Sequence, residues 1–344
     1  MALYPLLRPL AFALDAERAH RLTISALKRM PPANPPKPDP ALSSEVAGLT
    51  FANPVGVAAG FDKDAEVWRQ MLGFGFGFVE VGTLTPRPQE GNPRPRLFRL
   101  VEDEAVINRM GFNNGGLEAA APRLRAIGPG LVGANVGANK DSADRIADYV
   151  AGVQALGGVA DYLTLNISSP NTPGLRALQD KGALEELVAA VTEAAGELET
   201  PIFLKVAPDL ERADVDDIAS VALGRLDGLI VSNTTVARPA LRSRYAGEAG
   251  GLSGAPLKAL ALERLRDFRA ATGGQMPLIA AGGIGNGADA YERIRAGASL
   301  VQLYSALVYQ GPGLARRIAR ELKALLERDG FARVADAVGS GADA

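Results

Sequence analysis

The sequence predicts an α/β protein, a (β/α)8 TIM barrel with a small N-terminal helical segment that caps the barrel mouth. Eight short runs of apolar, often β-branched residues recur along the chain, and each is followed by a helical pattern. Strict alternation of this kind is typical of a parallel barrel, and runs that are apolar on both faces indicate fully buried strands. A doubly wound open sheet is the alternative architecture. The strands are expected at 55–59, 76–81, 131–136, 162–167, 202–206, 228–231, 278–281 and 300–303. The helices are expected near 64–72, 115–127, 143–157, 183–198, 212–224, 257–272, 287–296 and 313–328.

The chain is expected to hold one barrel domain with short additions at its ends. Its 344 residues would allow two domains of ~150 residues, but α/β barrels run to ~250 residues as one domain. Six of the ten residues from 31 to 40 are proline, which makes this stretch an extended linker. Two connections are long, and the one after the second strand should carry a hairpin of 97–100 with 105–108. The expected division is an N-terminal amphipathic helical segment (1–30), a proline-rich linker (31–42), the barrel (43–335) and a disordered tail (336–344).

The first 30 residues carry a net charge of +3, from five basic and two acidic side chains. Two helices are expected, at about 3–13 and after Asp15, which is a good N-cap. Such a segment fits a membrane-surface patch, and it equally fits a helix pair packed on the barrel or a dimer contact. Pro5, Arg8 and Pro9 interrupt its most apolar stretch, so we expect neither a membrane span nor a signal peptide.

The chain has no cysteine and one histidine. Disulfides, thiol nucleophiles, thiolate zinc sites and cysteine-bound iron–sulfur clusters are therefore excluded. Any Ser-His-Asp triad would depend on His20, and no metal site is expected. The net charge of −2 argues against a nucleic-acid partner.

Polar or glycine-rich residues follow every expected strand, where barrels place their active sites. Asparagine and lysine side chains that converge at one mouth indicate a ligand site, because unpaired buried polar groups are costly. Gly282, Gly283 and Gly285 fit a phosphate cradle, although a tight turn alone would explain them equally well. The residues that follow the strands are Lys63, Gly82, Thr83, Asn135, Asn166, Ser169, Asn171, Lys205, Tyr304 and Ser305.

Two of these side chains leave alternatives open. Ser169 is a poor base unless it is activated, and its Pro/Gly-rich loop fits either a lid that closes over a ligand or a plain turn. Lys205 and Lys63 fit a Schiff-base lysine as in barrel aldolases, a cation beside an anionic cofactor ring, or a side chain that reaches solvent. An oxidoreductase, a Schiff-base lyase or aldolase, and a non-catalytic flavin or phosphate sensor all remain possible from these residues.

Long motifs spread from about residue 4 to 325 resemble the class 2, quinone-dependent, membrane-associated dihydroorotate dehydrogenases. They are NPVGVAAGFDKD, EVGTLTPRPQEGNPRPRLFRL, INRMGFNNGG, NISSPNTPGLR, LKVAPDL, SNTT, GGLSG and GASLVQLYS. The resemblance implies oxidation of dihydroorotate to orotate in pyrimidine biosynthesis, with FMN as cofactor and a membrane quinone as acceptor. It implies a peripheral position on the cytoplasmic side of the inner membrane, reached through the N-terminal helices. It implies no iron–sulfur partner subunit.

The resemblance also implies roles for individual residues. Ser169 would be the catalytic base, in place of the cysteine of soluble class 1 relatives. FMN would be held by Ala59, Gly60, Phe61, Asp62, Lys63, Thr83, Asn135, Asn166, Lys205, Ser232, Gly254, Gly283, Tyr304 and Ser305. Dihydroorotate would be bound by Lys63, Asn108, Arg109, Met110, Gly111, Phe112, Asn166, Asn171, Asn233 and Thr234. The quinone would meet His20, Arg99 and Tyr304.

Overall fold

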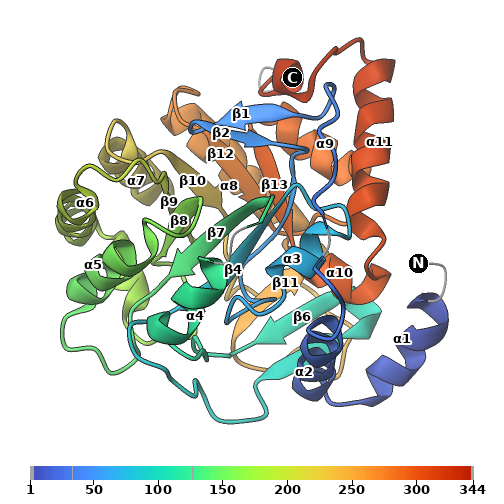
Figure 1. Ribbon diagram of the computed structural model, residues 1–344, viewed down its shortest axis with the longest axis horizontal. Helices are drawn as coiled ribbons and strands as arrows, with labels where there is room; N and C mark the ends of the chain where they lie inside the picture. Colours follow the sequence, from blue (N-terminus) through green and yellow to red (C-terminus); the bar gives the residue numbers. More distant parts are fainter. Residues whose placement is uncertain (1–3, 33, 126–127, 342–344) are drawn as a thin grey trace.

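Eight parallel strands close into a barrel in the computed structural model, which describes residues 4–32, 34–125 and 128–341 (Figure 1). The ring runs β10-β12-β13-β3-β4-β7-β8-β9 and closes where β9 pairs with β10. This confirms the predicted TIM barrel and rules out the open sheet. The strands are β3 (Val55–Val57), β4 (Phe78–Leu84), β7 (Leu131–Val136), β8 (Tyr162–Asn166), β9 (Ile202–Val206), β10 (Gly228–Val231), β12 (Leu278–Ala281) and β13 (Leu300–Leu303).

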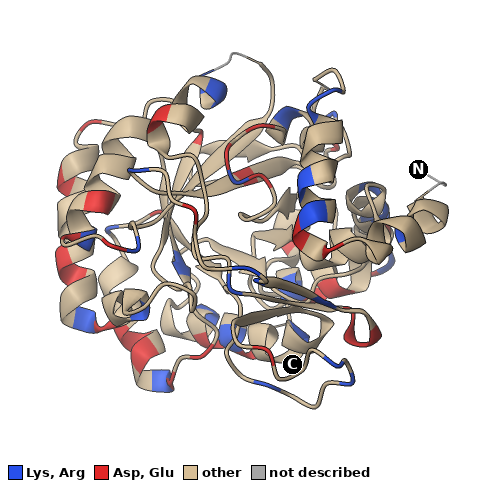
Figure 2. Ribbon diagram, turned by 90° about the horizontal axis from the view of Figure 1, so that it is seen from below, with Lys and Arg blue, Asp and Glu red and all other residues tan. Residues whose placement is uncertain are grey.

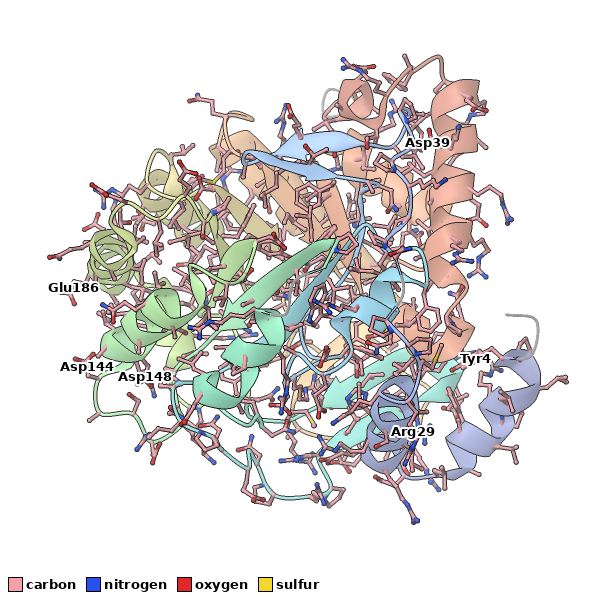
Figure 3. All side chains as sticks on the ribbon, in the orientation of Figure 1. Tyr4, Arg29, Asp39, Asp144, Asp148 and Glu186 are labelled. Atoms are coloured by element: carbon pink, nitrogen blue, oxygen red, sulfur yellow. The ribbon has the colours of Figure 1, made fainter. Side chains whose placement is uncertain are left out.

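Helices surround the barrel and follow the strands (Figure 1). The eight predicted helices are confirmed, and α10 is an additional helix that was not predicted. Asp144 shows how such a helix begins, because its carboxylate accepts a hydrogen bond from the Ala147 N–H at 3.0 Å. Asp144, Asp148 and Glu186 lie on the outer side of the molecule (Figure 3). Acidic and basic residues are interspersed over these helices (Figure 2). The helices are α3 (Trp68–Leu72), α4 (Leu117–Leu124), α5 (Arg145–Leu156), α6 (Lys181–Ala195), α7 (Arg212–Ala222), α8 (Lys258–Ala271), α9 (Gly287–Arg295), α10 (Ser305–Gln310) and α11 (Leu314–Arg328).

A two-stranded hairpin plugs the barrel at the amino ends of its strands. It consists of β1 (Ser44–Val46) and β2 (Leu49–Phe51), which were not predicted. Phe51 is fully buried and meets the Phe78 ring edge-on, with 5.1 Å between the centroids. This apolar plug leaves the opposite end of the barrel for the polar residues.

A three-stranded antiparallel sheet lies outside the barrel ring. The predicted hairpin is confirmed as β5 (Leu97–Leu100) and β6 (Ala105–Asn108). The third strand, β11 (Gly251–Gly254), comes from the long connection after β10 and pairs with β6. The two long connections therefore meet in one small sheet.

The two predicted N-terminal helices are present as α1 (Tyr4–Ala13) and α2 (Ala16–Leu27). Asp15 caps α2, because its carboxylate accepts a hydrogen bond from the Arg18 N–H at 2.9 Å. Both helices lie outside the barrel, beside α10 and the β5–β6 hairpin (Figure 1). Tyr4 reaches toward the barrel, where its hydroxyl donates to the Val308 carbonyl (Figure 3). Within the described ranges, no helix has the length and apolar character needed to cross a membrane.

The predicted disordered tail is wrong for residues 336–341. The short helix Val334–Ala337 is followed by backbone hydrogen bonds from Gly339 to Ile294 and from Gly341 to Arg295, at 3.0 and 2.9 Å. Gly339 has a φ of +77°, a conformation that glycine adopts without strain and that turns the chain back onto α9. Residues 342–344 lie outside the described residues.

Candidate active site

One cavity of about 850 Å³ extends from the N-terminal helices to the carboxyl ends of the barrel strands. This volume lies within the ~300–1,000 Å³ of ordinary ligand pockets. Its outer part is apolar and is lined by Leu7, Ala11, Phe12, Ala19 and Leu27 of α1 and α2. Its inner part is polar and includes Ser169, Lys205 and asparagines from the strand ends. A single space therefore joins two chemically different compartments.

All but three of the predicted site residues line this cavity. The exceptions are Asp62, Asn135 and Arg109. The Asp62 carboxylate accepts the backbone N–H groups of Glu66 and Val67, both at 2.8 Å, and so shapes the loop after β3. Burial raises the pKa of Asp62 to about 6.

Arg109 and Asn135 lie at different places relative to the cavity lining. The Arg109 guanidinium points away from the cavity lining, where it bonds Glu248 at 2.8 Å and stacks over Phe98 at 4.6 Å. Asn135 lies directly behind the lining: Thr83 donates to its Oδ1 at 2.6 Å, and the Asn166 amide does so at 3.1 Å.

The loop after β8 brings Ser169 to the polar end. Ser169 is buried, and its Oγ accepts the Asn171 N–H at 3.3 Å. The Asn171 amide in turn donates to Asn108 on β6 at 3.2 Å, which ties this loop to the small sheet. Thr172 was not singled out from the sequence. Its buried hydroxyl has no hydrogen-bond partner among the residues described.

Two lysines, the buried Lys205 and the half-buried Lys63, give the polar end its positive charge. Lys205, on β9, is buried, and its ammonium makes no hydrogen bond within the described part of the chain. Burial lowers the pKa of Lys205, and the Glu80 carboxylate opposes that shift. Lys63 donates to the Gly60 carbonyl at 3.0 Å, and burial lowers its pKa to about 8. A buried lysine that lacks a partner fits an anionic ligand group.

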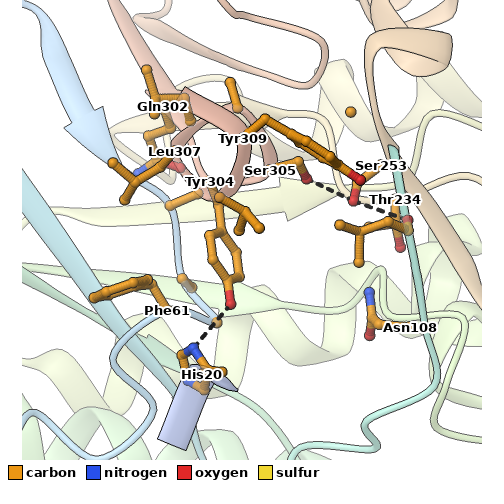
Figure 4. Close-up of a pocket in the computed structure, with 18 of the residues that line it drawn as sticks. His20, Phe61, Asn108, Thr234, Ser253, Gln302, Tyr304, Ser305, Leu307 and Tyr309 are labelled. Carbon is orange, nitrogen blue, oxygen red and sulfur yellow. Dashed lines mark hydrogen bonds between the residues drawn. The ribbon is translucent and has the colours of Figure 1, made fainter. Parts of the chain in front are cut away.

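The glycines expected at a phosphate are held where no side chain fits. A Cβ on Gly283, whose φ is +72°, would lie 2.4 Å from the Lys258 Cα. A Cβ on Gly254, whose φ is +97°, would lie 2.4 Å from the Glu104 carbonyl oxygen. Beside them, the Ser305 hydroxyl donates to Ser253 at 2.8 Å (Figure 4). The chain thus presents bare backbone and two hydroxyls at this corner.

Three aromatic rings stand where the apolar and polar ends meet (Figure 4). The His20 Nδ1 lies 3.4 Å from the Tyr304 hydroxyl, and the Phe61 ring is 5.6 Å from each of the other two rings. Burial lowers the pKa of His20 to about 3, with the charges of Lys63 and Arg21 adding to the effect. His20 is therefore neutral at physiological pH. Burial also raises the pKa of the Tyr304 hydroxyl.

Arg99 lines the apolar end, but its donors are already engaged. Its guanidinium donates to the carbonyls of Ala11, Phe12 and Leu14 at the end of α1, and it stacks over the Phe12 ring at 4.6 Å. Basic side chains at a helix carboxyl end stabilise it. Arg99 therefore holds α1 at the cavity wall.

A buried ion pair anchors α2. Glu17 accepts two hydrogen bonds from Arg96, at 2.7 and 3.0 Å, and one from Arg94 at 3.1 Å. Burial acts to raise the pKa of Glu17, but the two arginines outweigh it and hold that pKa below its usual value. Arg96 also donates to the carbonyls of Glu90 and Asn92, and the Asn92 amide donates to the Asn171 carbonyl. One chain of contacts thus runs from the helices to the Ser169 loop.

Ser253 and Gln302 also line the cavity and were missed from the sequence. Ser253 lies in the GGLSG segment, whose glycines were a usable signal. Gln302 sits in a strand run in which a lone polar residue indicates an inward-facing side chain.

Comparisons with known proteins agree with this arrangement. The family model described as dihydroorotate dehydrogenase matches residues 41–326. The chain is 66% identical to the dihydroorotate dehydrogenase (quinone) of Sphingopyxis alaskensis, over 99% of this chain and 98% of that one. It is 62% identical to the protein of the same name from Novosphingobium aromaticivorans, over 99% and 100% of the two chains.

A solved structure adds the fold. The crystal structure of the Eimeria tenella enzyme in complex with ferulenol superposes with a TM-score of 0.91 at 45% identity, covering 95% of this chain and 96% of that one. The match spans the barrel and reaches nearly the whole chain. The chain belongs to the dihydroorotate dehydrogenase family, in its quinone-dependent class 2.

Proposed function

We propose that this protein oxidises dihydroorotate to orotate and passes the electrons to a membrane quinone, with FMN as its resident cofactor. The observation that carries the proposal is the single cavity, polar around Ser169 and Lys205 and apolar between α1 and α2. A polar pyrimidine and an apolar quinone need these two environments, and both must reach the same cofactor. Family membership supports the reaction.

The residues at the polar end fit FMN. The unbonded Lys205 ammonium suits a flavin ring that becomes anionic on reduction. The glycine corner formed by Gly254 and Gly283, with Ser305 beside it, suits the phosphate. Thr83 and Asn166 offer neutral polar contacts to the ring edge. Bound at these residues, FMN would supply the two-electron acceptor for the hydride of the substrate and the two-electron donor for the quinone.

On the substrate side, Ser169 would act as the base: its Oγ would take the proton that leaves C5 of dihydroorotate as its own hydroxyl proton passes to a water molecule, while the hydride leaves C6. Asn108, Asn171 and Asn233 bind the pyrimidine ring and its carboxylate through neutral hydrogen bonds, with Lys63 supplying the positive charge. The buried position of Ser169 keeps bulk water away from the reacting atoms. Arg109 is left out of this set, because Glu248 engages it.

On the quinone side, α1 and α2 form the entrance, with His20 and Tyr304 between it and the cofactor. Six of the nine exposed large apolar side chains in the described ranges lie within the first 30 residues: Leu6, Leu7, Leu10, Leu14, Leu22 and Met30. Basic residues flank them. This combination is typical of helices that lie in a membrane surface. It supports a peripheral position at a membrane surface, which the family resemblance places on the cytoplasmic side of the inner membrane.

An absorption spectrum of the purified protein tests this proposal. We expect a bound flavin that bleaches when dihydroorotate is added without oxygen and recovers when a quinone follows. A protein without flavin, or a flavin that dihydroorotate leaves oxidised, would refute the proposed function. Borohydride trapping of a carbonyl substrate on Lys205 would instead favour the Schiff-base alternative.

A further inference from the structure

A carboxylate lies inside the barrel, behind the residues that line the cavity. Glu80 belongs to β4 and has no solvent exposure. Burying a charged group is costly unless it is fully hydrogen-bonded. Glu80 meets that condition by accepting four hydrogen bonds, from Asn135 at 2.8 Å, Gln302 at 2.8 Å, Thr164 at 3.2 Å and Tyr162 at 3.3 Å.

The hydrogen bond to Asn135 has a defined direction in the structure. The Asn135 NH2 group donates to Glu80 Oε1, so the Asn135 Oδ1 faces away from Glu80. That Oδ1 accepts from the Thr83 hydroxyl and the Asn166 amide. If the Asn135 amide were turned round, it would present hydrogens to two donors.

The donor-to-acceptor order of these hydrogen bonds continues from Asn135 to Asn166 and on toward the Ser169 loop. Because the Asn166 NH2 group is used on Asn135 and Thr83, its Oδ1 faces the other way. There it accepts the Asn233 amide at 3.1 Å and the Ser168 hydroxyl at 3.2 Å. Each bond fixes the next, so the orientation of these amides traces back to the carboxylate.

We propose that Glu80 is a positioning residue, which sets the orientation of Asn135 and Asn166 and thereby the pattern of donors and acceptors offered to the flavin and the pyrimidine. This inference rests on the proposed flavin site. The Glu80 carboxylate also acts on Lys205, because its charge opposes the lowering of the Lys205 pKa by burial.

A double-mutant cycle tests the direction of the bond. In Asn135→Asp, two carboxylates face each other, and we expect FMN affinity to fall about tenfold or more. In Asn135→Asp combined with Glu80→Gln, the introduced glutamine amide donates to the introduced aspartate, while the glutamine oxygen still accepts from Gln302. All the other bonds keep their direction, so the double variant should recover most of the lost affinity. A double variant that binds FMN as weakly as Asn135→Asp, or more weakly, would overturn the inference.

The pH dependence of FMN binding by Asn135→Asp is a second measurement, which general destabilisation of the protein would not affect in the same way. Two facing carboxylates bind a shared proton readily, so FMN affinity of Asn135→Asp should rise as the pH falls. The wild type and the double variant should lack this rise. Asp161→Asn is the control. Asp161 precedes β8 at the other end of the barrel, where its carboxylate accepts the Val132 N–H. Loss of this carboxylate should leave FMN affinity unchanged.

A neutron structure of the wild-type holoenzyme decides the matter even if a variant does not fold. We expect both amide deuterons of Asn135 on the atom nearest Glu80 and none on the Glu80 carboxylate. A protonated Glu80 that donates to the Asn135 oxygen would refute the inference. A wild type without FMN would instead contradict the proposed function, so the two failures are distinguishable.

Discussion

The polar end of the cavity rests on barrel strands, whereas its apolar end is closed by two helices that lie outside the barrel. At the polar end, Asn135, Asn166 and Lys205 are buried and stand on strands held from both sides. At the apolar end, α2 is anchored by Glu17 and α1 by Arg99, while several leucines remain exposed. Chemistry that needs exact geometry is thus placed on rigid elements. Entry of an apolar substrate is left to helices that are much less buried, since α1 has no buried residue.

The largest effect is expected when the proposed base at the polar end of the cavity, Ser169, is removed. Ser169→Ala should slow reduction of the flavin by dihydroorotate roughly 10²–10⁴-fold, because a positioned base contributes about that much. Reoxidation by quinone should stay unchanged, as measured by stopped-flow absorbance of each half-reaction. The exposed Ser220→Ala is the control and should match the wild type. Equal loss in both half-reactions would contradict two separate ends.

A second change, in two exposed leucines of α1, should affect only the apolar end of the cavity. Leu6 and Leu10 are 71% and 69% exposed on α1. Replacing both with serine should weaken binding to lipid vesicles roughly tenfold to a hundredfold, because apolar burial drives such binding. Turnover with a water-soluble quinone should persist. Leu198→Ser, at an exposed leucine far along the chain from α1, is the matched control. Unchanged vesicle binding by the double variant would refute the membrane-facing role of α1.

The smallest expected effect is that His20 takes up no proton between pH 8 and about 5. His20 is the only histidine, so its NMR signal needs no assignment. Its pKa is lowered to about 3 in the folded protein, against 6.5 for an exposed histidine. The signal should therefore stay that of neutral imidazole from pH 8 down to about 5. A midpoint near 6.5 would show that α2 does not bury His20.

The same shift has a consequence for stability. Below pH 6.5 the unfolded chain takes up a proton on this histidine, but the folded protein does so only near pH 3. The contribution of His20 to folding stability is therefore present at neutral pH and declines as the pH falls below 6.5. In denaturant titrations, the wild type should therefore lose stability relative to His20→Gln as the pH falls from 7 toward 4, and a difference that does not change with pH would contradict the burial of His20.

The repeated elements could be predicted from sequence, because local patterns specify them. The apolar strand runs and the Asp15 cap indicate their structure within a few residues. The β1–β2 plug and the pairing of β11 with β6 depend on segments that are distant in sequence. No local pattern specifies such contacts.

The sequence named many of the residues that line the cavity, but not how they contact one another. The sequence named Asn135, yet only the pairing of β7 with β4 and β8 shows that it lies behind the lining against Glu80. Arg109 stands in a matching motif, but Glu248, which turns its side chain away, is 139 residues further on. A single glutamate within the apolar run FVEVGTL was a usable signal of a buried polar role.

The measurement that tests the two-ended cavity most directly is a comparison of both half-reactions in Glu17→Gln. Losing this buried ion pair should loosen α2 and slow flavin reoxidation by quinone roughly tenfold, since small displacements are costly in a binding site. Reduction by dihydroorotate should slow much less, because Arg96 keeps its bonds to the Glu90 and Asn92 carbonyls and Asn92 keeps its bond to the Ser169 loop. Glu66→Gln, which removes the more exposed pair with Lys28, should alter neither half-reaction. If Glu17→Gln slows both half-reactions equally, or slows neither, the separation of the two ends is contradicted.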